Sequence, residues 1–452
     1  MFKIKIQSLL SILVSKSIMK LSKFLFQGGT NFPGKVALKL DKDILKTIAS
    51  NYEVILITGT NGKTTTTSMI YSIIKDSNTP VITNNTGANM YTGIVACFIS
   101  NYSFRKSLKK KIAVIEVDEA NLKFVTEYIT PSIITITNLF RDQMDRYGEV
   151  YTTLKKILEG IDKVPSATLL LNGDESLFGN LNLKNDIKYY GFATKINENK
   201  IVGINADAKF CTICKAPYEY NFITYNHLGD FYCTECGYKR PPLTYSIDKI
   251  VVLNTSGSTV YIDNKEYYIN QPGTYNIYNA LCAYSVAKFL GISDDTIEHS
   301  LKTVASSFGR QETLNIEGKE VKIILVKNPA GYDEAVSTIN LDKRKINLCL
   351  LLNDNYADGK DVSWIWDVNF ERLTSLNINK VMISGIRLYD MAIRLKVAGF
   401  PADSFLLCTE EESLLNEIKT CTGEIVYILA TYTAMINLRK FLHTKGYIDK
   451  IW

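Results

Sequence analysis

Residues 59–65 read G-T-N-G-K-T-T, a combination of glycine, lysine and threonine that is typical of loops that bind phosphate. Glycines let such a backbone curl until its amide groups point inward, and a following helix adds positive potential at its N-terminus. Lys63 is then placed to reach the terminal phosphates of a nucleotide, and the Thr64 hydroxyl to bind Mg²⁺. We therefore predict that this loop binds Mg²⁺-ATP. The residues assigned to ATP binding in it are Gly59, Thr60, Asn61, Gly62, Lys63, Thr64 and Thr65.

The loop is shorter than the common G-x-x-x-x-G-K-[ST] pattern, which would need glycine at the position of Ile57. The alternative interpretation is a turn that carries an exposed lysine and a threonine-rich helix start. The order of the elements favours phosphate binding, because a buried apolar run at 54–58 precedes the loop and a helix-like run at 68–74 follows it.

The segment 111–121 reads as a buried strand that ends in acidic residues. In a doubly wound sheet the carboxyl ends of the strands face the nucleotide, so Glu116 is positioned to hold Mg²⁺ together with Thr64. The other interpretation is an acidic loop that only follows a strand. We predict that Glu116 and Lys63 are catalytic, because both would stabilise charge on a transferring phosphoryl group.

Two C-x-x-C pairs, separated by 18 residues, form a third candidate site. Four thiolates at this spacing can surround one tetrahedral Zn²⁺, with each pair chelating from a tight turn. No ligand position is left open, so we predict a structural zinc site; redox pairs or free buried thiols are the alternatives. The predicted ligands are Cys211, Cys214, Cys233 and Cys236.

The zinc insert spans about residues 206–242 and is rich in tyrosine and phenylalanine. Such rings can stack nucleic-acid bases, but a ribbon this small also needs aromatic side chains to make a core. Few basic residues interleave with them, so we favour the core and expect no nucleic-acid partner. The rings in question are Tyr218, Tyr220, Phe222, Tyr225, Phe231 and Tyr232.

The composition is that of a globular protein with two or three domains: 452 residues, 46% hydrophobic, 22% charged, with a net charge of +6. Nine cysteines without a recognisable secretion signal point to the cytoplasm. Residues 1–26 read as a basic amphipathic helix that either packs on the main domain or lies peripherally at the inner face of the membrane. Its lysines are not confined to one face, so we favour packing. No stretch is long enough to span a bilayer.

The elements that position these residues predict an α/β protein. Residues 1–45 hold the N-terminal helix and a glycine-rich loop at 27–35. Residues 46–312 form the ATP-binding central domain, a P-loop domain with a parallel sheet into which the zinc ribbon is inserted. Residues 313–452 form a smaller α/β domain, because strand-like runs alternate there with helical stretches.

The central domain resembles the Mur ligases and folylpolyglutamate synthetases, which use ATP to activate a carboxylate. The resemblance rests on the short phosphate loop, on Glu116 after its strand, and on T-N-L-F-R-D-Q-M-D at 137–145. Gln143 stands where the family usually has a metal-binding histidine, and the segment with a carbamylated lysine is missing. The resemblance therefore implies one Mg²⁺ site, on Thr64 and Glu116, and leaves a second one open.

Two further segments carry the same resemblance. Residues 273–280 match a G-x-x-N-x-x-N-A segment, which implies that Asn276 and Asn279 bind adenine; a helix cap and turn is the other interpretation. Arg310 matches an arginine that meets the ATP phosphates ahead of the last domain. Of the D-Y-A-H-x-P segment expected near residue 327, only Asn328-Pro329 remains.

The C-terminal segments 353–367, 384–387 and 431–435, together with the four-cysteine insert, resemble the MurT family, the synthetase subunits of lipid II isoglutaminyl synthase. This resemblance implies ATP-dependent amidation of the α-carboxyl of D-glutamate in the stem peptide of a lipid-linked peptidoglycan precursor, through an acyl phosphate. It also implies a heterodimer in which a GatD-like glutamine amidotransferase supplies ammonia. The chain has no G-x-C-x-G-like nucleophile segment of its own.

Four aspartates lie in the segment 353–367, which follows a predicted strand. Class I amidotransferases use a cysteine and a histidine that is oriented by a carboxylate. The resemblance implies that this segment supplies the carboxylate to the partner, and we choose Asp358, because Gly359 permits a sharp turn. Asp354 and Asp361 are the reserves, and a polar turn before an aromatic-anchored helix is the other interpretation.

Two other functions fit parts of the pattern. A conventional Mur or folylpolyglutamate-type ligase would add an amino acid and would release phosphate only when that amino acid is present. A non-enzymatic zinc-ribbon protein would bind nucleotide or nucleic acid in a salt-sensitive way.

Overall fold

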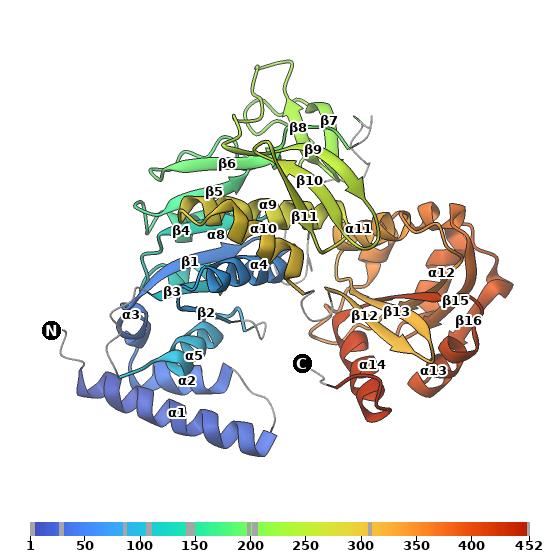
Figure 1. Ribbon diagram of the computed structural model, residues 1–452, viewed down its shortest axis with the longest axis horizontal. Coiled ribbons are helices and arrows are strands. Elements are labelled where there is room, and N and C mark those ends of the chain that lie inside the picture. Colours follow the sequence, from blue (N-terminus) through green and yellow to red (C-terminus); the bar gives the residue numbers. More distant parts are fainter. Residues whose placement is uncertain are drawn as a thin grey trace.

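The computed structural model describes residues 5–26, 31–84, 88–104, 111–141, 150–196, 200, 207–305 and 310–449. Figure 1 shows a central sheet with its helices, a group of N-terminal helices at one end of it, and a second sheet formed by the C-terminal part of the chain. None of the described helices combines the length and the apolar character needed to cross a membrane.

The central sheet has nine strands in the order β11-β10-β9-β6-β5-β4-β1-β3-β2. Within this sheet β2, β3, β1, β4, β5, β6 and β9 run parallel, and β10 and β11 extend the edge as an antiparallel meander. Its strands are β1 (Tyr52–Thr58), β2 (Val81–Thr83), β3 (Lys111–Glu116), β4 (Ile133–Ile136), β5 (Thr168–Asn172), β6 (Ile187–Phe192), β9 (Tyr245–Leu253), β10 (Ser258–Ile262) and β11 (Lys265–Ile269).

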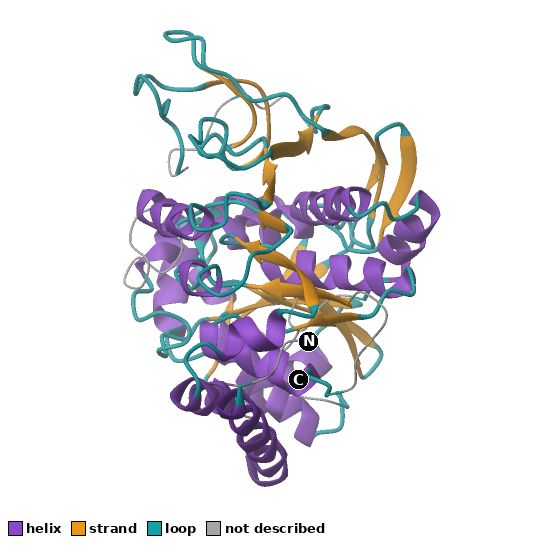
Figure 2. Cartoon of the chain, turned by 90° about the vertical axis from the view of Figure 1, so that its left-hand side faces the viewer, coloured by secondary structure: helices purple, strands orange, loops and turns teal. Residues whose placement is uncertain are grey.

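Helices cover both faces of this sheet (Figure 2). Along β1, Ile55 and Ile57 join the core under α4, α9 and α10, whereas Val54 and Leu56 join the core on the opposite face. Burial on both faces explains why β1 reads as a continuous apolar run. These helices are α4 (Lys63–Asp76), α5 (Tyr91–Asn101), α6 (Leu122–Val125), α8 (Val150–Ile161), α9 (Thr274–Phe289) and α10 (Asp294–Thr303).

The N-terminal part forms three helices: α1 (Ile6–Phe26), α2 (Asn31–Leu40) and α3 (Ile44–Ala49). The predicted helix near the N-terminus is confirmed and packs on α2 and α5. The predicted glycine-rich loop is wrong for residues 31–35, which begin α2; residues 27–30 lie outside the described part. Pro33 fits a first helical turn, where its missing N–H has no helical partner. Gly34 packs so closely on α5 that a Cβ would lie 1.8 Å from the Thr92 carbonyl oxygen.

The zinc insert leaves the sheet after β6 and returns at β9, which pairs parallel with β6. It contains the antiparallel hairpin of β7 (Glu219–Tyr225) and β8 (Leu228–Tyr232). In Figure 1 this hairpin lies at the opposite end of the molecule from α1. The insert is thus the crossover connection between two parallel strands of the main sheet.

The C-terminal sheet has the order β12-β13-β17-β14-β15-β16, parallel except for β12. Apolar clusters lie on both of its faces, so the second α/β unit expected from sequence is present. The boundary predicted at 313 falls inside β12. The strands are β12 (Arg310–Ile316), β13 (Lys319–Leu325), β14 (Ile346–Leu351), β15 (Ile378–Ser384), β16 (Phe405–Cys408) and β17 (Ile425–Ala430). The helices are α11 (Pro329–Ile339), α12 (Leu388–Val397), α13 (Glu411–Thr420), α14 (Tyr432–Thr444) and the 3₁₀ turns η1 (Ser363–Asp367), η2 (Phe370–Ser375) and η3 (Ala402–Ser404).

Candidate functional site

The loop after β1 lies where the strand order reverses, between β3 and β4, which is the usual ligand position in an open parallel sheet. Gly59 and Gly62 have φ values of 121° and 83°, a left-handed region that favours glycine. A Cβ on Gly59 would lie 2.4 Å from the Thr137 hydroxyl, and one on Gly62 would lie 2.1 Å from the side-chain oxygen of Asn279. Both glycines are therefore required by backbone conformation and by close packing.

Lys63 begins α4, and its side chain is buried over the loop. Its ammonium group donates to the carbonyl oxygens of Gly59 and Thr60 and pairs with Glu119 at 2.9 Å. Burial acts to lower the pKa of Lys63, but the neighbouring carboxylates of Glu119 and Glu116 outweigh it and raise the pKa. The lysine is therefore held charged at the helix N-terminus, as phosphate binding requires.

Glu119 is a site residue that the sequence reasoning did not single out. It follows Glu116 by three residues in the same acidic strand end, which was the available signal. Sequence alone gave no reason to prefer one carboxylate over the other as the partner of Lys63.

Thr64 and Glu116 are brought together as predicted: the Thr64 hydroxyl donates to Glu116 Oε2 at 2.9 Å. Asn89 donates to the other carboxylate oxygen at 2.9 Å. The side chain of Asn84 donates to the Glu116 carbonyl oxygen and accepts from the Glu116 N–H. A carboxylate and a hydroxyl oxygen at this distance are the donors that Mg²⁺ prefers. The donor set therefore fits the ion.

The end of β4 supports the loop from the other side. The hydroxyl of Thr137 donates to the carbonyl oxygen of Asn61 at 2.7 Å, and Asn138 Oδ1 accepts from the Asn61 N–H at 2.9 Å. These bonds fix the middle of the loop. Residues 142–149, which include Asp142, Gln143 and Asp145, lie outside the described residues.

Asn276 and Asn279 lie on α9, where it packs against α4. Thr66 donates to Asn279 Oδ1 at 3.2 Å, Asn279 donates to Asn276 Oδ1 at 3.0 Å, and Asn276 donates to the Pro272 carbonyl at 2.8 Å. This network holds α9 next to the phosphate loop, and the adenine assignment stays a prediction. Arg310 begins β12, and its side chain lies outside the described part of the chain.

The C-terminal domain contacts the phosphate loop through a pair of amides. Asn328 donates to Asn61 Oδ1 at 3.1 Å, and Asn61 donates back to Asn328 Oδ1 at 3.4 Å. Asn328 is buried and caps α11 by accepting from the Gly331 N–H. The Asn-Pro pair noted in the sequence is thus where the second domain meets the nucleotide loop.

Asp358 follows β14 in a loop of the C-terminal domain. Its carboxylate accepts from the N–H of Thr433 at 2.7 Å, from the Thr433 hydroxyl at 2.5 Å and from the N–H of Asn355 at 3.1 Å. The side chain is buried, and Gly359 has the left-handed φ of 90° that the predicted turn requires. The carboxylate is therefore rigidly oriented.

The two reserve aspartates have other partners. Asp354 lies 3.7 Å from the Arg387 guanidinium, and Asp361 accepts from the Ser363 N–H at 2.8 Å at the start of η1. Beside this loop the C-terminal domain has an apolar face, here called the α12 surface, whose residues are each more than half exposed. They are Tyr356, Ile386, Tyr389, Ile393 and Val397.

The four predicted zinc ligands converge, with all four sulfur atoms within 4.8 Å of one another. No other cluster of three or more potential ligands occurs among the described residues. Burial acts to raise the pKa of the Cys211 thiol, but hydrogen bonds from the N–H groups of Cys214 and Ile213 lower the pKa, whereas the neighbouring thiols help to raise the pKa values of Cys214 and Cys236. The donor set and its geometry fit a closed Zn²⁺ site.

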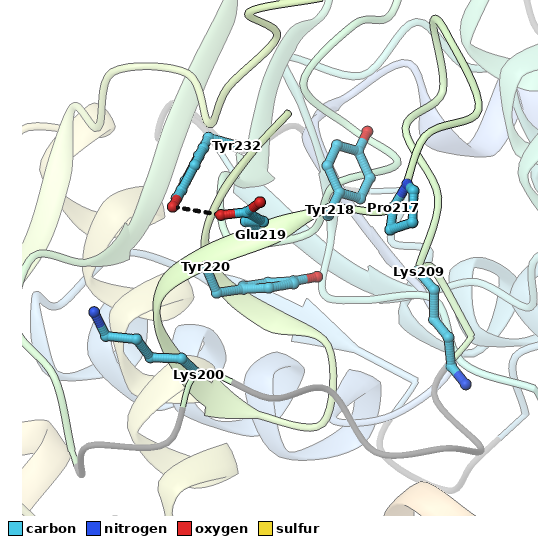
Figure 3. A pocket seen from close by; sticks show the side chains of 7 residues that line it. All are labelled: Lys200, Lys209, Pro217, Tyr218, Glu219, Tyr220 and Tyr232. Carbon is cyan, nitrogen blue, oxygen red and sulfur yellow. Dashed lines mark hydrogen bonds between the residues drawn. The ribbon is translucent and has the colours of Figure 1, made fainter. Parts of the chain in front are cut away.

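Tyr218, Tyr220 and Phe231 form the core of the insert, whereas Phe222 and Tyr225 join the core of the main sheet. Tyr218, Tyr220, Phe222, Tyr225 and Phe231 are buried, as the sequence interpretation favoured. The insert also carries an open pocket (Figure 3), but its tyrosine hydroxyls are already used: Tyr232 donates to Glu219 at 3.0 Å, and Tyr220 to the His227 carbonyl at 3.1 Å. The pocket is lined by Lys200, Lys209, Pro217, Tyr218, Glu219, Tyr220 and Tyr232.

A buried chain of bonds joins this insert to the phosphate loop. His227, between β7 and β8, lies 3.0 Å from Glu175 Oε2, and the same oxygen accepts from the Leu139 N–H at 3.2 Å. The next residue, Phe140, donates its N–H to the Thr60 hydroxyl at 3.1 Å. Burial acts to lower the pKa of His227, but Glu175 outweighs it and raises the pKa. The insert therefore supports the loop through His227 and Glu175.

Replacing Cys214 with serine is expected to lower the zinc content and destabilise the insert by about 3 kcal/mol or more, because a closed site holds its fold through the metal. Metal analysis and limited proteolysis within residues 207–242 measure both effects. Cys97, a lone partly exposed cysteine on α5, provides the control Cys97→Ser. Purified reduced protein without zinc, in which all four thiols titrate freely, would contradict the assignment.

Two family models match the chain: the Mur ligase middle domain over residues 57–287 and the MurT ligase C-terminal domain over residues 325–435. The chain is 44% identical to the lipid II isoglutaminyl synthase (glutamine-hydrolyzing) subunit MurT of Streptococcus pneumoniae, over 93% of this chain and 94% of that protein. It is 38% identical to the subunit of the same name from Staphylococcus aureus strain COL, over 86% and 87%.

Solved structures share the fold at low identity. A pseudomurein peptide ligase type C from Methanothermus fervidus has a TM-score of 0.69 at 20% identity, covering 90% of this chain and 81% of that one. MurF ligase from Thermotoga maritima, in complex with ADP, has a TM-score of 0.60 at 11% identity, with 90% and 85% covered. The predicted Mur ligase-type α/β fold is confirmed.

Proposed function

This chain belongs to the MurT family, the subunits named for lipid II isoglutaminyl synthase (glutamine-hydrolyzing), and on that basis we propose that it amidates lipid II. The substrate group is the α-carboxyl of D-glutamate in the stem peptide, and the product is D-isoglutamine. ATP supplies the energy, and the nitrogen comes from glutamine that a partner subunit hydrolyses. The main support for the proposal is that one chain contains both a phosphate-binding loop and a C-terminal domain of the MurT type.

The reaction has two steps. A carboxylate oxygen of the substrate attacks the γ-phosphorus of ATP, ADP leaves, and an acyl phosphate forms. Ammonia then attacks the acyl carbon, the C–O bond to phosphate breaks, and the amide forms while the phosphate leaves with the proton that the nitrogen loses. An enzyme that uses ammonia needs no pocket for an incoming amino acid, which fits the reduction of the D-Y-A-H-x-P segment to Asn328-Pro329.

The residues of the loop have separate tasks in this scheme. Lys63 and the loop N–H groups bind the phosphates and stabilise the charge that moves from the γ-phosphate to the leaving ADP. Thr64 and Glu116 would hold Mg²⁺, which, when bound, neutralises charge on the phosphate oxygens. Asn61 and Asn328 bring the C-terminal domain against the loop, so both domains enclose the reacting groups.

The partner is a GatD-like glutamine amidotransferase. The relatives are named as glutamine-hydrolyzing subunits, and this chain lacks a nucleophile segment for that hydrolysis. The α12 surface supplies exposed apolar side chains of the kind that protein interfaces bury, and Tyr356 in it is two residues from Asp358. We therefore assign this face to the partner.

Asp358 is the carboxylate offered to the partner's histidine. A carboxylate in that role is held by surrounding hydrogen bonds and fixes the imidazole tautomer, and the bonds from Thr433 and Asn355 supply such a hold. Asp358→Asn is expected to lower glutamine-dependent amidation about 10³-fold or more, with ammonium-dependent amidation within about twofold of the parent. Rates are measured with glutamine and with ammonium, on complexes whose assembly is verified by gel filtration.

Asp361→Asn is the matched control, because Asp361 lies three residues away and only caps η1. It should leave both rates near the parent values. Equal loss with both nitrogen sources in Asp358→Asn would place Asp358 in the synthetase site, and no loss with either would make it a turn residue.

The reaction itself is tested by mass spectrometry of stem peptides after incubation with ATP, Mg²⁺ and ammonium. One amide gained at D-glutamate is the expected product. Phosphate release that depends on an added amino acid would instead identify a conventional ligase. Because ATP and reduced thiols coexist in the cytoplasm and the substrate carries a lipid, we place the reaction at the inner face of the membrane.

A further inference from the structure

The face of helix α1 that packs against the protein is polar, and its apolar face points outward. Its buried face carries serines: Ser8 donates to Asp41 at 2.5 Å, Ser11 donates to the Ala37 carbonyl at 3.0 Å, and Ser15 is also buried. Ile12 is the apolar residue that this face places fully in the core. A helix that only had to pack on α2 and α5 would turn its leucines toward them.

The leucines of α1 instead face outward. The spacing i, i+3, i+4, i+7 from Ile6 places four of the exposed apolar side chains on one stripe, and a fifth lies two turns farther along. Figure 1 shows α1 at the outer edge of the molecule, with α2 and α5 on one side of it. The exposed fractions are 85% for Ile6, 38% for Leu9, 54% for Leu10, 49% for Leu13 and 58% for Leu21.

The charges of α1 indicate what covers this stripe. Helix α1 has no aspartate or glutamate, and lysines occur before it at position 5 and within it at 16, 20 and 23. Lys5 and Lys20 are exposed. A second copy of the chain placed on the stripe would bring lysines against lysines, whereas a surface of anionic phosphate groups complements them.

We propose that the outward face of α1 binds the surface of a bilayer that contains anionic phospholipid. The apolar stripe enters the boundary between head groups and acyl chains, and the exposed lysines Lys5 and Lys20 contact the phosphates, whereas Lys16 donates to the Tyr102 carbonyl oxygen. This inference deepens the proposed function, on which it rests for the lipid-linked substrate. It names the surface that holds the chain beside a membrane-anchored stem peptide.

The test uses co-sedimentation of the full chain with vesicles of phosphatidylcholine alone or with 30% phosphatidylglycerol. The parent protein should bind the anionic vesicles, and less so as salt rises, since salt screens the lysines. The double variant Leu10→Glu/Leu13→Glu should bind at least tenfold more weakly with an unchanged unfolding midpoint, because both side chains already face solvent. Val251→Glu/Val252→Glu, two exposed apolar residues of β9, is the matched control and should bind like the parent.

Two results would overturn the inference. One is equal vesicle binding by the α1 variant and the parent; the other is a parent dimer that the α1 variant converts to monomer while vesicle binding is unchanged. Amidation assays separate this inference from the proposed function. The α1 variant should lose activity on lipid II in anionic vesicles and keep it on a water-soluble stem-peptide substrate. If the parent binds vesicles but amidates neither substrate, the function fails and the membrane surface stands.

Discussion

Replacing Lys63 with methionine is expected to abolish ATP-dependent amidation, lowering kcat by about 10³-fold or more even with free ammonium. The methionine side chain keeps the apolar stem and removes the charge that the neighbouring carboxylates hold in place at the start of α4. Single-turnover formation of ADP, measured with saturating ATP, reports the chemical step directly.

Removal of Lys63 also leaves Glu119 buried without its partner, at a cost of about 3–5 kcal/mol in the free energy of unfolding. The double variant Lys63→Met/Glu119→Gln removes both charges and should recover most of that stability while remaining inactive. Lys75→Met, at the exposed far end of the same helix, is the control and should keep full activity. Near-normal turnover in either folded Lys63 variant would remove the lysine from the mechanism.

The second large effect is expected from Glu175→Ala, which should destabilise the protein by about 3–5 kcal/mol, because it leaves His227 buried without its carboxylate partner. It should also weaken ATP binding, since Glu175 holds the N–H of Leu139 one residue before the contact between Phe140 and Thr60. Urea unfolding gives the first quantity and calorimetric titration with ATP the second. Glu219→Ala, on the exposed side of the same insert, should change the stability by less than about 0.5 kcal/mol.

The predicted link between the insert and ATP binding would be contradicted by a Glu175→Ala protein that keeps the parental ATP affinity at a temperature where it is fully folded. The insert would then be a separate structural module. Glu175→Gln provides a milder case, because an amide can still accept a bond from the Leu139 N–H. It should lose less ATP affinity than Glu175→Ala.

The centre of the site could be predicted from sequence because its signals are local. The apolar run of β1, the two glycines and Lys63-Thr64 are consecutive, so strand, loop and helix start follow from neighbouring residues. Glu116 met Thr64 as predicted because parallel strands deliver their carboxyl ends to one edge. The family could also be recognised from sequence, because the segments that carry the resemblance are spread over most of the chain. The similarity to MurT subunits confirms it.

The features that could not be predicted from sequence depend on packing between distant segments of the chain. Gly34 was interpreted as part of a loop, but its lack of a side chain serves the close approach of α2 to α5. The contact between Asn61 and Asn328 joins two domains and has no periodicity that a sequence could display. The outward leucines of α1 were visible as an amphipathic pattern, but only the neighbouring helices reveal which face is buried.

The position of the zinc insert bears on how the chain reaches its native state. Strands β6 and β9 pair in parallel, so residues 193–244 must close a long connection before the β9–β11 meander can join the rest of the sheet. Closure of a longer loop has a larger entropic cost, and non-local parallel pairing is slow. The four thiolates and the β7–β8 hairpin lie within this connection and are mutually local, so metal binding there shortens the effective loop. Zinc supplied during refolding should accordingly speed the appearance of the completed sheet edge.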